Sequence, residues 1–159
     1  MLHQRIISLV PSITLLLFDL GLENNIVGRT KFCIHPKEKV NQIPIVGGTK
    51  NIDIQKVKLL QPTIIFANKE ENEKEPIETL QKDFKVVLTD VKNIEENYKM
   101  ITKVGKLTNT EIKAKEIITT TKLNFYNLTD SILKFSNFQI NTLYLIWRKP
   151  YMTIGKDTF

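Results

Sequence analysis

The sequence predicts an α/β fold: a parallel-sheet lobe with flanking helices, one long linking helix, and the first strand of a second α/β lobe. Two patterns support this prediction. Short apolar runs alternate with amphipathic segments along the N-terminal part, which is the order of parallel βα units. A single apolar stripe then continues from Ala114 to Phe135 in steps of three and four. We expect an N-terminal lobe at residues 1–108, a linking helix at 109–136, and the start of a truncated C-terminal lobe at 137–159.

Four short apolar runs predict the strands of the first lobe. Pro11 ends the first run, and the helix after it is expected to have Ser12 as its N-cap and Gly21 at its end. Each later run is likewise followed by a polar or turn residue, which limits its length to that of a buried strand. The predicted strands cover residues 5–10, 26–28, 63–67 and 85–89.

Apolar residues at helical spacing predict the helices between these strands. Asn51 or Asp53 can cap a short helix that Pro62 ends, and Asn93 with Glu96 forms a capping-box pattern. The predicted helices of this lobe cover residues 13–20, 54–60, 76–82 and 94–107.

The apolar stripe that follows predicts a helix roughly 35 Å long, because a helix rises 1.5 Å per residue. About three heptads with a threonine in the seam are marginal for a coiled coil, so a single helix packed along one or two lobes is the better interpretation. After it, an apolar run at residues 142–146 predicts a new strand. That strand is expected to run into a loop carrying Trp147, Arg148, Lys149, Tyr151 and Met152.

Composition describes a folded protein with an ordinary surface. Of the 159 residues, 42% are apolar, which is enough for a core. The net charge is +6, but the lysines are scattered and only three residues are arginine, so we expect no nucleic-acid partner. We also expect a monomer. The longest apolar run is far short of the ~20 residues of a membrane helix. The N-terminus shows no signal-peptide pattern.

Patterns that would support catalysis or metal binding are weak. Ser8 and Ser12 lie near a strand end without a nucleophile elbow around them, and Cys33 with His35 lacks the further ligands that a metal site needs. The Gly-Gly-Thr turn at 47–49 lacks the ending of a phosphate loop. We therefore expect no catalytic residues, no metal site and no enzyme activity.

The remaining candidate site is geometric. In a parallel sheet the carboxyl ends of the strands lie along one edge, where ligands bind. Aromatic and small polar residues follow the predicted strands at that edge, and the aromatic and basic loop near the end of the chain would face them from a second lobe. This lining favours binding over catalysis. The predicted ligand-binding residues are Pro11, Ser12, Phe32, Gly47, Gly48, Thr49, Asn68, Trp147, Arg148 and Tyr151.

Several blocks of the sequence resemble one known family. They are Arg5-Ile-Ile-Ser-Leu-Val-Pro-Ser12, Val27-Gly28-Arg29-Thr30, Ile45-Val46-Gly47-Gly48-Thr49, and Lys58-Leu-Leu-Gln-Pro-Thr63. Together they resemble the helical-backbone solute-binding proteins of ABC transporters, the Fe/B12 periplasmic-binding family. The blocks Tyr144-Leu-Ile-Trp-Arg-Lys-Pro-Tyr151 and Gly155-Lys-Asp-Thr-Phe159 are most similar to its cobalamin-binding branch.

The resemblance implies two α/β lobes joined by a long helix, and a receptor in the periplasm or cell envelope that passes its ligand to an ABC permease. It implies cobalamin or a related corrinoid as ligand, with an iron-siderophore or haem as the alternative, and no cofactor. It also implies docking to the permease through glutamates, here Glu73 and Glu75. Relative to this family the second lobe is truncated, and a half-receptor is expected to bind weakly or to be a non-binding remnant. A metal-handling, chelatase-like protein using Cys33 and His35 is a further alternative.

Overall fold

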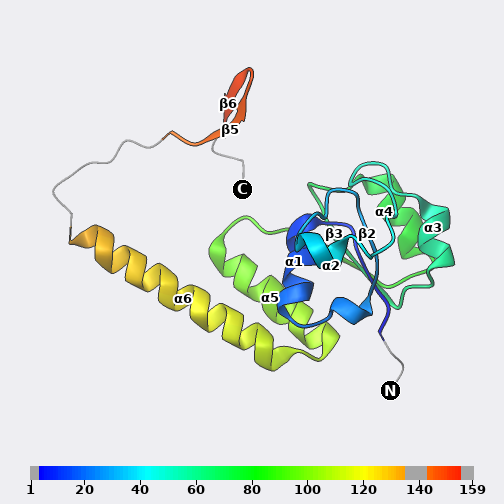
Figure 1. Ribbon diagram of the computed structural model, residues 1–159, viewed down its shortest axis with the longest axis horizontal. Helices are drawn as coiled ribbons and strands as arrows, with labels where there is room; N and C mark the ends of the chain where they lie inside the picture. Colours follow the sequence, from blue (N-terminus) through cyan, green and yellow to red (C-terminus); the bar gives the residue numbers. More distant parts are fainter. Residues whose placement is uncertain (1–3, 135–142, 155–159) are drawn as a thin grey trace. The chain divides into compact units, whose positions relative to one another are not determined.

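The computed structural model of the chain describes residues 4–134 and 143–154 (Figure 1). The chain divides into two compact units. The first comprises Met1–Asp90 with Leu107–Thr110, and the second comprises Val91–Lys106 with Glu111–Phe159.

A four-stranded parallel sheet forms the centre of the first unit. Its strands are β1 (Ile6–Ser8), β2 (Ile26–Arg29), β3 (Ile64–Asn68) and β4 (Val86–Thr89), in the order β2-β1-β3-β4. All neighbouring strands are parallel. The prediction of an α/β lobe with a parallel sheet is therefore confirmed.

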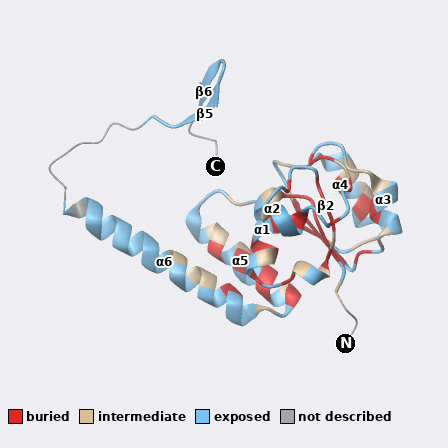
Figure 2. Ribbon diagram, in the orientation of Figure 1, coloured by how far each residue is buried: buried red, intermediate tan, exposed pale blue. Residues whose placement is uncertain are grey.

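Most of the sheet is buried because helices flank it, as the arrangement of buried residues in Figure 2 shows, although Leu88 of the edge strand β4 is exposed. The helices of this unit are α1 (Pro11–Asp19), α2 (Lys37–Val40), α3 (Ile54–Leu59) and α4 (Lys74–Gln81), with a short 3-10 turn at Glu23–Asn25. Every residue of β1 is buried, as expected for a central parallel strand. The core cluster contains Ile7, Leu9, Val46, Val57, Ile65, Ala67, Ile77 and Leu80.

The two ends of α1 test the predicted cap and the predicted stop. The prediction of Ser12 as N-cap is wrong: the helix begins at Pro11 and Val10 is the N-cap residue. Proline has the φ angle of a first helical residue and needs no hydrogen bond there, so it starts the helix instead of preceding it. The predicted stop at Gly21 is confirmed. Gly21 has a φ angle of 78° and ends the helix in a Schellman motif, in which Gly21 N–H donates to Phe18 O and Leu22 N–H donates to Leu17 O.

The second unit contains two helices and a hairpin. Helix α5 (Ile94–Thr108) begins after Asn93, whose Oδ1 accepts a hydrogen bond from Glu96 N at 2.9 Å, as the capping pattern predicts. Helix α6 (Glu111–Leu133) is the predicted long helix. Its stripe begins at the buried Ala114, whereas Phe125, Leu128 and Ile132 are exposed. Phe135, the last predicted position of the stripe, lies outside the described residues.

The predicted loop near the end of the chain is wrong, because its residues form a β-hairpin. Strand β5 (Leu145–Arg148) pairs antiparallel with β6 (Tyr151–Thr153), and Arg148 lies opposite Tyr151. Only two residues separate the strands, and so short a connection allows antiparallel pairing. The assignment of this hairpin to a second lobe stays a prediction.

Across residues 4–134 and 143–154, no helix combines the length and apolar character that crossing a membrane requires.

The N-cap of α3 gives a first test of the fold. Asp53 accepts a hydrogen bond from Lys56 N at 3.0 Å. Asp53→Ala removes this acceptor and should lower the free energy of unfolding by about 1 kcal/mol in urea denaturation. Asp53→Asn keeps the acceptor and should cost much less. Equal losses for both variants would show that the negative charge, and not the cap, stabilises the helix.

Candidate functional site

Seven of the predicted site residues lie at or beside the carboxyl edge of the sheet in the first unit. They follow β1, β2 and β3, which are adjacent and parallel, so their ends lie at one edge. The segment at 45–49 joins this edge because Ile45 pairs with Arg29 and Lys31 N donates to Gly47 O at 2.8 Å. The residues brought to this edge are Pro11, Ser12, Phe32, Gly47, Gly48, Thr49 and Asn68.

Phe32 is the aromatic side chain of this edge. Its side chain is 51% exposed, and the ammonium group of Lys31 lies 5.2 Å from the ring centroid. A Cβ atom on Gly48 would be 3.4 Å from both the Phe32 ring and the Lys31 side chain. The ring therefore lies against the Gly-Gly turn and still offers about half of its surface to a ligand.

The Gly-Gly turn requires a glycine at its first position, because the backbone there has a positive φ angle and leaves no room for a Cβ atom. Gly47 has φ +108°, and a Cβ atom there would come 2.2 Å from Asn51 O. Asn51 O accepts the hydrogen bond from Gly48 N at 2.9 Å, so its position is fixed. Gly48 has no such clash. Glycine is thus required at the first position of the turn, whereas a Cβ atom at the second would meet only the Lys31 and Phe32 side chains at 3.4 Å.

The polar site residues differ in what they offer to a ligand. Ser12 is exposed and Pro11 is half-buried at the start of α1. Thr49 is buried. Asn68 is half-buried, and its Oδ1 accepts hydrogen bonds from Glu70 N and Glu71 N at 2.9 and 3.2 Å while its Nδ2 donates to Thr89. Asn68 therefore shapes the loop after β3, and the accessible small polar group of the edge is Ser12.

The remaining predicted ligand-binding residues belong to the hairpin of the second unit. Trp147 and Tyr151 are 62% and 72% exposed, and Arg148 is also exposed. The indole Nε1 of Trp147 donates to Lys149 O at 3.0 Å, which fixes the ring against the turn. A cleft that combines this hairpin with the sheet edge stays a prediction.

Arg29 is a site-supporting residue that sequence analysis did not identify. Arg29 is only 5% exposed. Its guanidinium group donates to three main-chain oxygens: Nε to Val40 O at 2.9 Å, and Nη1 to Cys33 O at 3.1 Å and Thr30 O at 3.3 Å. These bonds fold the segment that carries Phe32 back onto the end of β2. An arginine directly after the predicted strand at 26–28, in a chain with only three arginines, was the available signal.

Cys33 belongs to a buried cluster of hydroxyl groups. Its Sγ lies 3.0 Å from the donating Oγ1 of Thr14 and 3.2 Å from Thr30 Oγ1, and Thr14 Oγ1 also lies 2.8 Å from Ser8 Oγ. His35, in contrast, is exposed. Within the described part of the chain, no three His, Cys, Asp or Glu side chains form a group that could hold a metal ion. The contacts of Cys33 thus fit a packing role in the loop that carries Phe32.

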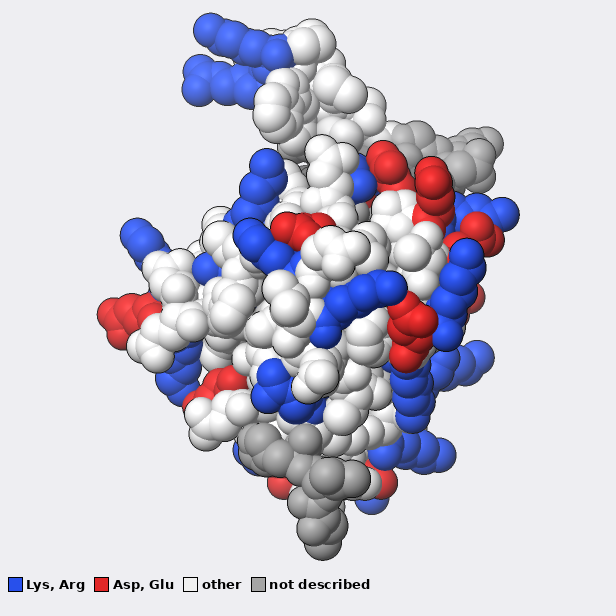
Figure 3. Space-filling model, turned by 90° about the vertical axis from the view of Figure 1, so that its right-hand side faces the viewer, with Lys and Arg blue, Asp and Glu red and all other residues white. Residues whose placement is uncertain are grey.

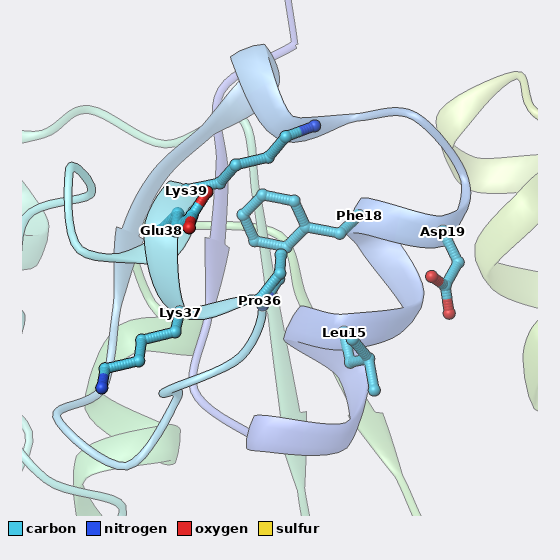
Figure 4. Close-up of a pocket in the computed structure, with 7 residues that line it drawn as sticks. All are labelled: Leu15, Phe18, Asp19, Pro36, Lys37, Glu38 and Lys39. Atoms are coloured by element: carbon cyan, nitrogen blue, oxygen red, sulfur yellow. The ribbon is translucent and has the colours of Figure 1, made fainter.

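A hollow of about 430 Å³ is lined by residues of α1 and by residues at and just before α2 (Figure 4). Its apolar lining is Leu15, Phe18 and Pro36, and charged side chains of both signs surround them. None of the predicted ligand-binding residues lines it. The sheet edge as the ligand site therefore stays a prediction, separate from this hollow.

The predicted docking glutamates lie at the start of α4. Glu73 is the N-cap residue and Glu75 is in the first turn, and both are exposed. Acidic side chains at a helix N-terminus also stabilise the helix through its dipole, so their position has a structural explanation too.

Figure 3 shows one face of the molecule, where basic and acidic side chains are intermixed.

Comparison with known proteins identifies the family. Residues 6–128 match the family model described as periplasmic binding protein, and the chain belongs to this family. The chain is 29% identical over 162 aligned residues to YvrC of Bacillus subtilis, an uncharacterized ABC transporter substrate-binding lipoprotein. This alignment covers 98% of the chain and 51% of the relative, so the chain spans about half the length of the curated relative it matches.

Solved structures show the same fold. The vitamin B12 binding protein BtuF of Vibrio cholerae matches with a TM-score of 0.81 and 22% identity, over 95% of this chain and 58% of that one. A possible iron-binding, periplasmic solute-binding protein of Staphylococcus epidermidis matches with a TM-score of 0.80 and 29% identity, over 98% of this chain and 62% of that one. A periplasmic haem-binding protein of Pseudomonas aeruginosa matches with a TM-score of 0.76 and 22% identity, over 82% of this chain and 47% of that one.

The two glycines of the edge provide a matched pair of variants. Gly47→Ala places a side chain at φ +108° and against Asn51 O, so it should lower the free energy of unfolding by about 1–3 kcal/mol. Gly48→Ala meets only ordinary contacts and should cost well under half as much. Urea denaturation of both variants measures the difference. A Gly47→Ala variant as stable as the native chain would show that this turn is not required in its present form.

Proposed function

We propose that this chain is the ligand-capturing part of the substrate-binding component of an ABC importer, and that it captures cobalamin or a related corrinoid for a membrane permease. The observation that carries the proposal is the sheet edge of the first unit. There a half-exposed Phe32 lies against Gly48, with the exposed Ser12 following the neighbouring strand. Such an edge binds a flat ligand by stacking and by small polar contacts, with no covalent step.

Family membership supports the binding role, because the matched family consists of periplasmic binding proteins. YvrC is named an ABC transporter substrate-binding lipoprotein, which supports a permease partner and a location outside the cytoplasmic membrane. We propose the same location here, together with a monomeric state. We propose no catalytic activity, since the function requires only capture and release of a small molecule.

The choice of ligand rests on the hairpin and on one fold neighbour. The exposed Trp147 and Tyr151 of the hairpin offer aromatic surface of the kind that stacks on a flat ring, and BtuF is a vitamin B12 binding protein of the same fold. An iron chelate is the second candidate, favoured by the 29% identity to the possible iron-binding protein. Haem-binding proteins are also among the fold neighbours, so the ligand experiment includes haem.

Equilibrium dialysis against cyanocobalamin, haemin and ferrichrome tests the ligand proposal. We expect selective retention of cyanocobalamin, and an affinity about 3–10-fold lower for Phe32→Ala, because a stacked aromatic pair contributes ~0.5–1.5 kcal/mol. Ile34→Ala is the control, since Ile34 is an exposed apolar residue of the same loop. Selective retention of haemin or ferrichrome would replace the corrinoid with that ligand class, and retention of none would contradict the function.

Delivery to a permease can be tested at the proposed docking residues. Charge reversal by Glu73→Lys together with Glu75→Lys should reduce uptake of labelled cobalamin by cells that express the chain with its transporter, without changing ligand affinity. Glu38→Lys is the control, because Glu38 is also an exposed first-turn glutamate. Unchanged uptake by the double variant would remove these two residues from the docking surface.

A further inference from the structure

Asn72 connects three loops of the sheet edge through one buried side chain. The residue is 5% exposed and lies just before α4. Its Nδ2 donates to Thr49 O at 2.9 Å and to Leu9 O at 3.3 Å. Its Oδ1 accepts a hydrogen bond from Asn68 N at 2.9 Å. The side-chain amide thus uses both its hydrogens and its oxygen on main-chain groups of the edge.

These three partners come from three different strand ends. Leu9 follows β1, Asn68 ends β3, and Thr49 follows the segment that pairs with Arg29 at the end of β2. The strands are neighbours in the order β2-β1-β3, so Asn72 spans the part of the edge where the proposed ligand would lie. Because the side chain is buried, it acts on the main chain of the edge, not on the solvent side.

We propose that Asn72 is a positioning residue for ligand binding, a role that rests on the proposed function. Its amide holds the turn that carries Gly48 and the segment that leads into Ser12 at one fixed distance from the end of β3. A ligand that contacts both segments then binds without ordering them first, and affinity is gained by reducing that entropic cost.

The chemistry of the amide makes the proposal specific to asparagine. Only an amide supplies two donors and one acceptor in a side chain of this size. Asn72→Asp keeps the shape but places carboxylate oxygens against the carbonyl oxygens of Thr49 and Leu9. Asn72→Ala leaves all three main-chain groups without this partner. Both variants retain the hydrogen bond from Asn72 N to Asn68 O at 3.0 Å, so they isolate the side chain.

A control side chain, the exposed Thr63, lies at the opposite edge of the same sheet. Thr63 Oγ1 accepts a hydrogen bond from Arg5 N at 3.0 Å and donates to Arg5 O at 3.2 Å. Thr63→Val removes these side-chain hydrogen bonds with little change of shape, far from the proposed ligand surface. It reports what the loss of a side-chain hydrogen bond outside the ligand edge does to binding.

Two measurements on the full chain test the proposal. The first is amide hydrogen exchange, which should become faster in segments 9–12 and 47–50 of the Asn72 variants while the centre of β3 stays protected. The second is affinity for whichever of cyanocobalamin, haemin and ferrichrome the native chain retains, measured at a temperature where circular dichroism shows every variant folded. We expect Asn72→Ala and Asn72→Asp to weaken binding by about tenfold or more, and Thr63→Val by less than about twofold.

Each outcome decides a different point. Affinity of the Asn72 variants within about twofold of the native value would overturn the positioning role, even if their melting temperature falls. An equal loss of affinity in Thr63→Val would also overturn it, because general destabilisation would then explain the effect. If the native chain retains none of the three probes, the proposed function fails and the ligand role of Asn72 fails with it. Faster exchange would then show only that Asn72 orders the loops.

Discussion

The arrangement of the candidate site depends on one constraint: main-chain oxygens that are buried at the end of a parallel sheet must receive hydrogen bonds. Arg29 supplies them to Val40, Thr30 and Cys33, and Asn72 supplies them to Leu9 and Thr49. The loops after three strands are therefore held by buried polar side chains. Rigid loops of this kind can present Phe32 and Ser12 to solvent at defined positions.

Features that depend on neighbouring residues were predictable from the sequence. The parallel strands and the stop at Gly21 follow from short apolar runs and from local turn chemistry, which also limited the cap of α3 to Asn51 or Asp53. The start of α1 was misplaced by one local detail, since Pro11 itself is the first helical residue. Asn72 could not be found in this way, because its partners lie 23 and 63 residues away in the sequence.

The first unit and the later part of the chain differ in how far their apolar side chains are buried. The first unit has a buried core and satisfied polar loops, whereas the apolar side chains of α6 and of the hairpin are largely exposed in the residues that the structure describes. Large exposed apolar surfaces usually mark an interaction site. That α6 links this unit to a second lobe stays a prediction, and the chain spans about half the length of the curated relative it matches.

The central claim is that the sheet edge of the first unit is the ligand surface. A titration of the ¹⁵N-labelled chain with cyanocobalamin, followed by two-dimensional NMR, tests it most directly. The account predicts that the amide signals of Ser12, Phe32 and Gly48 shift with increasing ligand, while those of Leu15 and Lys37 in the hollow between α1 and α2 stay unchanged. Shifts confined to the hollow, with an unaffected sheet edge, would contradict it.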